Sequence, residues 1–139
     1  MQQANSVLDV CSQTLPESVC FLMDFQGVTI AASNRARHDS FLGKSYAFRP
    51  YFQQAIQGAA GRYWALGVTS KQLGYYASSP VQDPAGQIIG AAVIKRSFVE
   101  MQAVIRNHFL GLIIDRHGIV VMANRPEMIL KSLWPYSTG

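Results

Sequence analysis

Two basic residues in otherwise apolar segments are the best candidates for chemistry. Arg49 directly precedes Pro50, which suits the first position of a helix. A guanidinium beside the free N–H groups of a helix start can hold an anion with fork-like donors. Lys95 ends the odd-numbered, otherwise apolar face of a predicted strand. Because a buried lysine needs a negative partner, the two residues predict a site for an anion.

The distribution of charge agrees with an anion site, although simpler roles remain open. Between Ser40 and Gln82 there is no acidic residue, whereas four basic residues lie there: Lys44, Arg49, Arg62 and Lys71. A pocket lined by this stretch would prefer an anion. Arg49 equally suits a surface arginine with its stem on aromatic neighbours, and Lys95 suits the solvated end of a strand.

Hydroxyl groups follow the same part of the chain. Thr69 and Ser70 lie at a predicted turn, and Tyr76 and Ser78 share one face of the next predicted strand. Such groups can orient a carboxylate through hydrogen bonds. Serine and threonine are common in turns, so these residues indicate a site only through their convergence with the two basic residues on one sheet face.

Motifs for catalysis, metal binding and cofactor binding are missing from the sequence. His38, His108 and His117 stand in different local settings, and no nucleophile elbow, HExxH, CxxC or Walker-type loop occurs. We therefore expect no enzyme, no metal and no cofactor. The net charge of +4 comes without a basic run or a nucleic-acid motif, so we expect no nucleic-acid partner.

Cys11 and Cys20 are too few for a disulfide scaffold and lack metal-ligand spacing. They suit two small buried hydrophobic residues, or a disulfide in an oxidising compartment. The sequence leaves both possibilities open.

The elements that must position these residues follow from composition and periodicity. The 139 residues are 49% hydrophobic and 14% charged, which is enough for one core. The longest apolar runs are far shorter than the roughly 20 residues of a membrane-spanning helix, and no signal peptide is visible. Periodicity and turn residues predict helices over 1–14, 50–57 and 97–107, and strands over 19–24, 28–33, 62–69, 74–81 and 87–96.

An internal repeat adds a second hairpin. The segment 23–28 (MDFQGV) is echoed by 114–119 (IDRHGI), which indicates either two hairpins alike by chance or two related modules. The element order predicts an α+β, PAS-like fold, in which a five-stranded antiparallel sheet packs on the N-terminal helix and the start of a second PAS-like module follows. The segment 40–61 would roof the free face of the sheet and enclose a small-molecule pocket.

At these residues the chain resembles the double Cache sensor domain of DctB-like sensor histidine kinases, a family that detects four-carbon dicarboxylates outside the inner membrane. The resemblance rests on the segments 31–34 (AASN), 40–43 (SFLG), 46–52 (YAFRPYF), 61–67 (GRYWALG), 69–70 (TS), 74–76 (GYY), 79–81 (SPV) and 93–95 (VIK).

The resemblance implies roles for single residues. Arg49 would clamp one carboxylate of the ligand, and Lys95 would meet the other. Relatives that bind amino acids carry an acid near the Lys95 position, so the lysine favours a second anionic group. Further hydrogen bonds and the pocket wall would come from the other site residues: Tyr46, Tyr51, Thr69, Ser70, Tyr76 and Ser78.

The resemblance also implies a domain organisation. Residues 1–17 would end a long N-terminal helix, 18–98 would form the membrane-distal ligand-binding module, 99–108 a connecting helix, and 109–139 the opening hairpin of a truncated membrane-proximal module. The transmembrane helices and kinase of the family would lie outside this chain. We expect a periplasmic location, and a homodimer through the N-terminal helix in the full-length receptor.

Two other functions keep the same fold. The module would serve as a sensor for another small anion or for an amino acid, or as a ligand-free scaffold for dimerisation or a partner protein. Filling of the pocket by protein side chains would favour the scaffold.

Overall fold

A computed structural model describes residues 1–66, 73–97, 112–123 and 125–133. The chain divides into two compact units, one of Met1–Ala65 with Gly74–Ser97 and the other of Leu66–Leu73 with Phe98–Gly139. The predicted helix 97–107 and the connecting segment 99–108 lie outside the described residues, apart from Ser97. Among the helices of the described part, none combines the length and hydropathy needed to cross a membrane.

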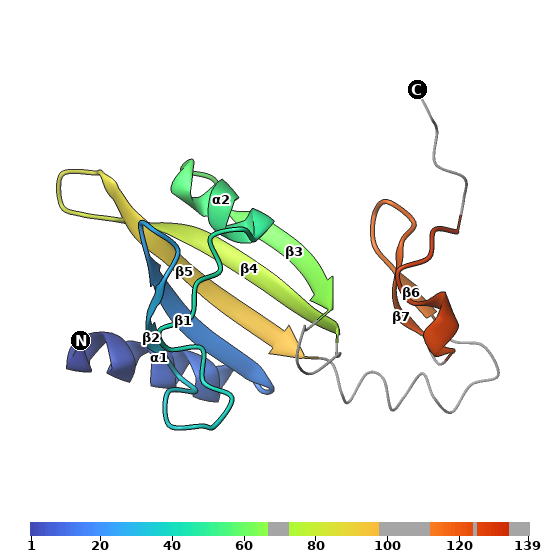
Figure 1. The fold of residues 1–139 in the computed structure, drawn as a ribbon, viewed down its shortest axis with the longest axis horizontal. Helices are drawn as coiled ribbons and strands as arrows, with labels where there is room; N and C mark the ends of the chain where they lie inside the picture. Colours follow the sequence, from blue (N-terminus) through green and yellow to red (C-terminus); the bar gives the residue numbers. More distant parts are fainter. Residues whose placement is uncertain (67–72, 98–111, 124, 134–139) are drawn as a thin grey trace. The chain divides into compact units, whose positions relative to one another are not determined.

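The first unit is built on a five-stranded sheet with the strand order β2-β1-β5-β4-β3 (Figure 1). The β1–β2, β1–β5 and β4–β5 pairs are antiparallel, which confirms the predicted α+β class. Each strand lies within a few residues of its predicted range, and the bounds are β1 Ser18–Asp24, β2 Thr29–Ala32, β3 Gly61–Leu66, β4 Leu73–Gln82 and β5 Ile88–Ser97.

Helix α1, Gln2–Thr14, covers one face of the sheet over β1 and β2. Its Leu8 packs with Cys20 and Ala31, and all three side chains are buried. A bidentate ion pair adds to this contact, because the Arg35 guanidinium donates to both Asp9 oxygens at 2.7 and 2.8 Å. The helix is therefore fixed to the sheet by a small apolar cluster, this ion pair and a hydrogen bond from the Ser12 hydroxyl to the Ser18 carbonyl at 3.0 Å.

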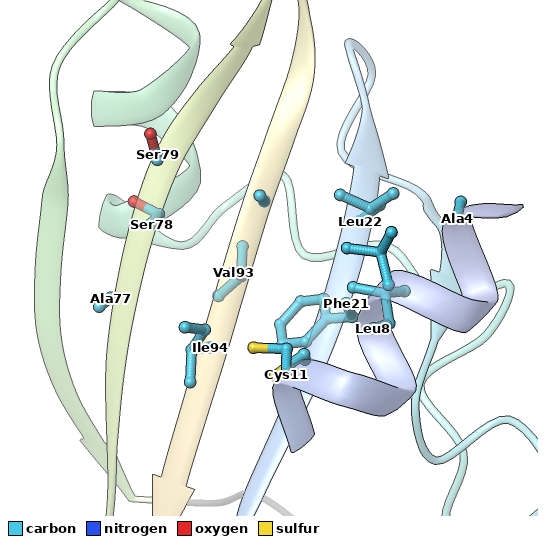
Figure 2. Close-up of a pocket in the computed structure, with 13 residues that line it drawn as sticks. Ala4, Leu8, Cys11, Phe21, Leu22, Ala77, Ser78, Ser79, Val93 and Ile94 are labelled. Atoms are coloured by element: carbon cyan, nitrogen blue, oxygen red, sulfur yellow. The ribbon is translucent and has the colours of Figure 1, made fainter. Parts of the chain in front are cut away.

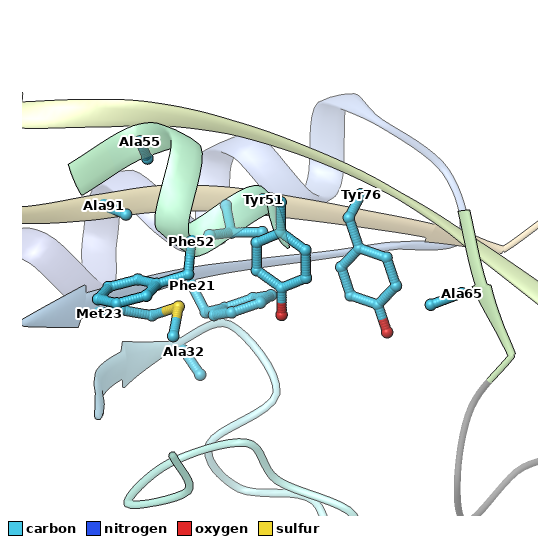
Figure 3. Packing of buried hydrophobic residues seen from close by; sticks show 10 residues of the cluster. Phe21, Met23, Ala32, Tyr51, Phe52, Ala55, Ala65, Tyr76 and Ala91 are labelled. Carbon is cyan, nitrogen blue, oxygen red and sulfur yellow. The ribbon is translucent and has the colours of Figure 1, made fainter. Parts of the chain in front are cut away.

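Helix α2, Pro50–Ile56, covers the opposite face. Side chains alternate between the two faces of a strand, and the odd-numbered Phe21, Met23 and Val93 point toward α2. They form the larger core with Tyr51 and Phe52 of the helix (Figure 3). This face also carries those predicted site residues that the structure describes.

The same turn motif occurs in the β1–β2 hairpin, in the β4–β5 hairpin and in the hairpin of the second unit. In the first hairpin the Asp24 carboxylate accepts from the backbone N–H groups of Gln26 and Val28, and Gly27 adopts φ 88°. Asp83 accepts from Ala85 and Gln87 in the same way. A short aspartate side chain closes the turn, and glycine supplies the left-handed conformation.

The second unit repeats this hairpin with strands β6, Leu112–Ile114, and β7, Val120–Ala123. Asp115 accepts from His117 and Ile119, and Gly118 adopts φ 78°. A 3-10 helix η1, Pro126–Met128, follows. Both hairpins also shift register near the turn, after Leu22 and after Ile113. The predicted repeat therefore extends to backbone geometry, while the assignment of a second module stays a prediction.

Candidate functional site

Lys95 lies on the α2 face of β5, in register with Tyr76 of β4. Its side chain is half-buried, and its ammonium lies 5.4 Å from the ring centroid of Phe41 and 5.9 Å from that of Tyr76. Gly74 leaves room for the lysine stem, because a Cβ there would lie 3.1 Å from Lys95 Cε. Two aromatic rings and a glycine thus hold the ammonium over the sheet rather than at a solvated strand end.

Among the described residues, no carboxylate forms an ion pair with the Lys95 ammonium. Burial lowers the pKa of Lys95 below its ordinary 10.5, while the charge of Asp39 raises it and the charges of Arg37 and Arg49 lower it. Asp39 is itself bound to Arg37 at 2.9 Å. Two guanidinium groups and one carboxylate thus act on the lysine, and because that carboxylate is already paired with Arg37, an anion beside the ammonium would be favourable.

Arg49 is the residue immediately before α2, with an extended backbone at ψ 136°. Its guanidinium lies 4.9 Å from the ring centroid of Phe48. The expected free N–H groups of the helix start are partly engaged, because Phe52 and Gln53 both donate to the Arg49 carbonyl at 3.1 Å. The predicted anion receptor would therefore depend on the guanidinium, and the contact of Arg49 with a ligand stays a prediction.

Three of the predicted tyrosines gather on the same face. The rings of Tyr51 and Tyr76 stack with centroids 4.8 Å apart and planes 4° apart, and Figure 3 shows their hydroxyls pointing the same way. Tyr46 packs against Phe21 with ring centroids 6.2 Å apart. Burial raises the pKa of all three tyrosines, and the charge of Arg49 opposes this shift. The structure thus provides neutral hydroxyls within the field of Arg49.

Ser78 lies on this face but has a contact of its own. Its buried hydroxyl donates to the Tyr51 carbonyl at 2.7 Å and so ties β4 to α2. Gly61 makes this possible, because a Cβ at that position would collide with Ser78 Oγ and lie 2.9 Å from the Tyr51 oxygen. The structure therefore gives Ser78 an anchoring contact, and its predicted contact with a ligand stays a prediction.

The structure brings Tyr46, Arg49, Tyr51, Tyr76 and Lys95 to one face, whereas Thr69 and Ser70 lie outside the described residues. Within the described residues no group of three or more histidine, cysteine, aspartate or glutamate side chains is arranged to hold a metal ion.

Several neighbours of the site were not predicted as site residues from the sequence, namely Arg37, Phe41, Tyr63 and Gly74. Phe41 and Tyr63 stand in segments that carry the family resemblance, 40–43 and 61–67, which is the signal that could have singled them out. Arg37 lies just before the first of these segments and gave no such signal.

An apolar pocket of about 510 Å³ lies on the other face of the sheet, between α1 and strands β4 and β5 (Figure 2). Its wall contains neither Arg49 nor Lys95, so it is distinct from the pocket expected under the segment 40–61. An apolar wall offers no counter-charge to an anion. The residues that line it are Ala4, Val7, Leu8, Cys11, Cys20, Phe21, Leu22, Ala77, Ser78, Ser79, Ala92, Val93 and Ile94.

The comparison with curated proteins finds relatives of a single name. The chain is 34% identical over 137 residues to the C4-dicarboxylate transport sensor protein DctB of Pseudomonas aeruginosa. The aligned region covers 98% of this chain and 22% of that protein. The protein of the same name from Rhizobium meliloti is 32% identical over 128 residues, covering 91% of this chain and 20% of the relative. The chain thus spans about a fifth of the curated relatives it matches.

A solved structure gives the same result. The sensor domain of the histidine kinase DctB from V. cholerae superposes with a TM-score of 0.79 at 33% identity, over 99% of this chain and 53% of that one. No family model matches the chain.

Proposed function

We propose that this chain, a homologue of the DctB sensor proteins with the fold of their sensor domain, senses a small dicarboxylate of the succinate, malate or fumarate type. It would do so as the periplasmic part of a two-component sensor histidine kinase, with the kinase outside this chain. The relatives' name, C4-dicarboxylate transport sensor protein, supports the ligand class.

The observation that carries the proposal is the half-buried ammonium of Lys95, which has Arg37 and Arg49 nearby and no bonded carboxylate among the described residues. A buried charge without a partner destabilises a protein. A ligand carboxylate would supply the missing partner, so binding and relief of this cost are the same event.

The residues divide the work between the two carboxylates. The Arg49 guanidinium donates two parallel hydrogen bonds to one carboxylate, and the Lys95 ammonium binds the other. The hydroxyls of Tyr46, Tyr51 and Tyr76 have raised pKa values, so they remain hydrogen-bond donors at neutral pH. The predicted contribution of Thr69 and Ser70 rests on the resemblance alone.

An amino acid is the second candidate ligand, because Asp39 is an acid whose charge acts on Lys95. Its carboxylate would meet the ligand ammonium. However, Asp39 is already paired with Arg37, and its side chain is 48% exposed. A solvated and neutralised carboxylate is a weak receptor for an ammonium, so the dicarboxylate is favoured.

In the full-length receptor we expect α1 to contribute to a homodimer. Val7 and Val10 on α1 are 64% and 62% exposed and form an apolar stripe that a second helix could cover. The membrane would be reached only through segments outside this chain.

A thermal-shift titration against succinate, malate, fumarate, acetate and an amino acid tests the proposal. A ligand at a hundred times its Kd adds about 2.7 kcal/mol of stability, which raises Tm by several degrees. A shift with the dicarboxylates alone supports the proposal. A cooperative transition that none of them moves would favour the ligand-free scaffold instead.

The Arg49→Gln variant tests the clamp. Loss of a bidentate charged contact should weaken dicarboxylate affinity about 30-fold or more in calorimetry. Arg62→Gln is the matched control, because Arg62 is exposed and alternates with Tyr63, which places it on the α1 face. Both variants remove one positive charge. An equal loss of affinity in both would therefore show that net charge, and not a contact of Arg49 with the ligand, causes the loss.

A further inference from the structure

The two cysteines meet across the interface between α1 and the sheet. Cys20 lies in β1 and is 1% exposed, and Cys11 lies on α1 and is partly exposed. Both belong to the small cluster around Leu8 and line the apolar pocket on the α1 face. They therefore share one microenvironment, although nine positions separate them in the sequence.

Their positions follow from the periodicity of the two elements. Leu8 and Cys11 are three residues apart on α1 and share the face that meets the sheet. Cys20 and Leu22 alternate along β1 and point toward α1. Figure 2 shows the Cys11 sulfur pointing from the helix toward the sheet beside Ile94.

The two thiols interact in the structure, which holds both as free thiols. Burial and the neighbouring Cys11 thiol raise the pKa of Cys20 to about 12. Cys20 is thus protonated at neutral pH and shielded from solvent, whereas Cys11 is the thiol that an external oxidant can reach first.

We propose that Cys11 and Cys20 form a redox site, in which a disulfide between them ties α1 to β1. This inference is independent of the dicarboxylate site, which lies on the opposite face of the sheet. The cross-link would close a loop of only ten residues, counted from Cys11 to Cys20. It would add a covalent bond to an interface that already contains the Leu8 cluster, the Asp9–Arg35 ion pair and a hydrogen bond from the Ser12 hydroxyl to the Ser18 carbonyl.

The oxidant is a disulfide compound that acts by thiol–disulfide exchange. The Cys11 thiolate attacks one sulfur of the donor, so that a mixed disulfide forms and one donor thiolate leaves. Cys20 then loses its proton, and its sulfur attacks the Cys11 sulfur and expels the second donor thiolate. Two protein thiols are oxidised, and the donor disulfide is reduced to two thiols.

The experiment exposes the whole chain to oxidised glutathione under native conditions. Free thiols are then alkylated, and the protein is cleaved by a glutamyl endopeptidase. Glu17 lies between the two cysteines, so its cleavage leaves two peptides that only a disulfide can hold together. We expect loss of both alkylatable thiols in the monomer and recovery of the linked peptides.

Thermal denaturation provides a second readout. A disulfide that closes a loop of this length should raise Tm by roughly 5–10 °C, and reduction with dithiothreitol should reverse the rise. The Cys11→Ser variant is the matched control. Because position 11 is only partly buried, this variant should fold, form no cross-link and show the same Tm with and without oxidant.

Three results would overturn the proposal. One is full alkylation of both thiols after oxidation of the folded chain, and another is a stable glutathione adduct on Cys11 without the linked peptides. The third is a cross-link that forms only in denaturant, which would show that the folded geometry does not bring the sulfurs together.

Discussion

At the scale of single residues, we expect Lys95 to favour ligand binding and to destabilise the ligand-free protein. Its ammonium is half-buried and has no bonded carboxylate among the described residues. We predict that Lys95→Met raises the Tm of the ligand-free protein, because a similar stem packs against Phe41 and Tyr76 without a buried charge. The same variant should lose the Tm shift that dicarboxylates produce.

The exposed Lys44 offers the control. Lys44→Met removes the same charge from the surface, and it should leave both the ligand-free Tm and the dicarboxylate shift unchanged. If Lys95→Met keeps the full ligand-induced shift, Lys95 does not bind the second carboxylate.

Lys95 also predicts a pH dependence of stability. Burial lowers its pKa below 10.5 in the folded protein. Between that lowered pKa and 10.5 the unfolded chain holds more of the Lys95 proton, so the contribution of Lys95 to the free energy of unfolding rises with pH in this window.

Affinity for a dicarboxylate should run in the opposite direction, because the ligand requires the charged lysine. We predict that affinity falls as pH rises through the lowered pKa of Lys95. The raised pKa values of Tyr46, Tyr51 and Tyr76 keep the hydroxyls neutral over the same range. Calorimetry from about pH 7 to about pH 10 measures the slope. If the affinity of Lys95→Met shows the same pH dependence, a group other than Lys95 causes it.

At the scale of elements, the docking of α2 on the sheet depends on a buried hydrogen bond. The Ser78 hydroxyl donates to the Tyr51 carbonyl at 2.7 Å. We predict that Ser78→Ala lowers the free energy of unfolding by about 1 kcal/mol, because the carbonyl loses this donor. Chemical denaturation measures the change.

Ser79→Ala is the matched control, since Ser79 is the next residue of β4 and is exposed. It should change stability by less than about 0.5 kcal/mol. The pair also separates two roles of Ser78. An anchoring role predicts nearly unchanged dicarboxylate affinity in Ser78→Ala, whereas a large loss of affinity would show direct contact with the ligand.

The elements themselves could be predicted from the sequence because their signals are local. Three-residue and four-residue spacing marks α1, Pro50 marks the start of α2, and glycines mark the turns. These features act within a few residues, so a single sequence reveals them.

The surroundings of the site depend on tertiary contacts and are harder to predict. Phe41 reaches Lys95 from a connection distant in sequence, and the Ser78 hydroxyl bonds to a carbonyl 27 positions away. No local pattern encodes either contact. The closeness of Cys11 and Cys20 likewise depends on how α1 lies on the sheet, which is why the sequence left their redox state open.

At the scale of the whole molecule, the site residues that the structure describes belong to one unit. Tyr46, Arg49, Tyr51, Tyr76 and Lys95 all lie in the first unit. The hairpin of β6 and β7 lies in the second and carries none of them. A ligand on this site should therefore order one unit of the chain selectively.

Hydrogen exchange of the whole chain tests this division. We predict that saturating succinate slows exchange in peptides covering α2 and the paired strands β4 and β5, because the ligand would join Arg49 at the start of α2 to Lys95 of β5. Peptides covering residues 112–123 should exchange at the same rate with and without succinate. The Arg49→Gln variant should show no slowing at the same succinate concentration. Equal protection of residues 112–123 in the unaltered chain would contradict the predicted selective ordering of the first unit.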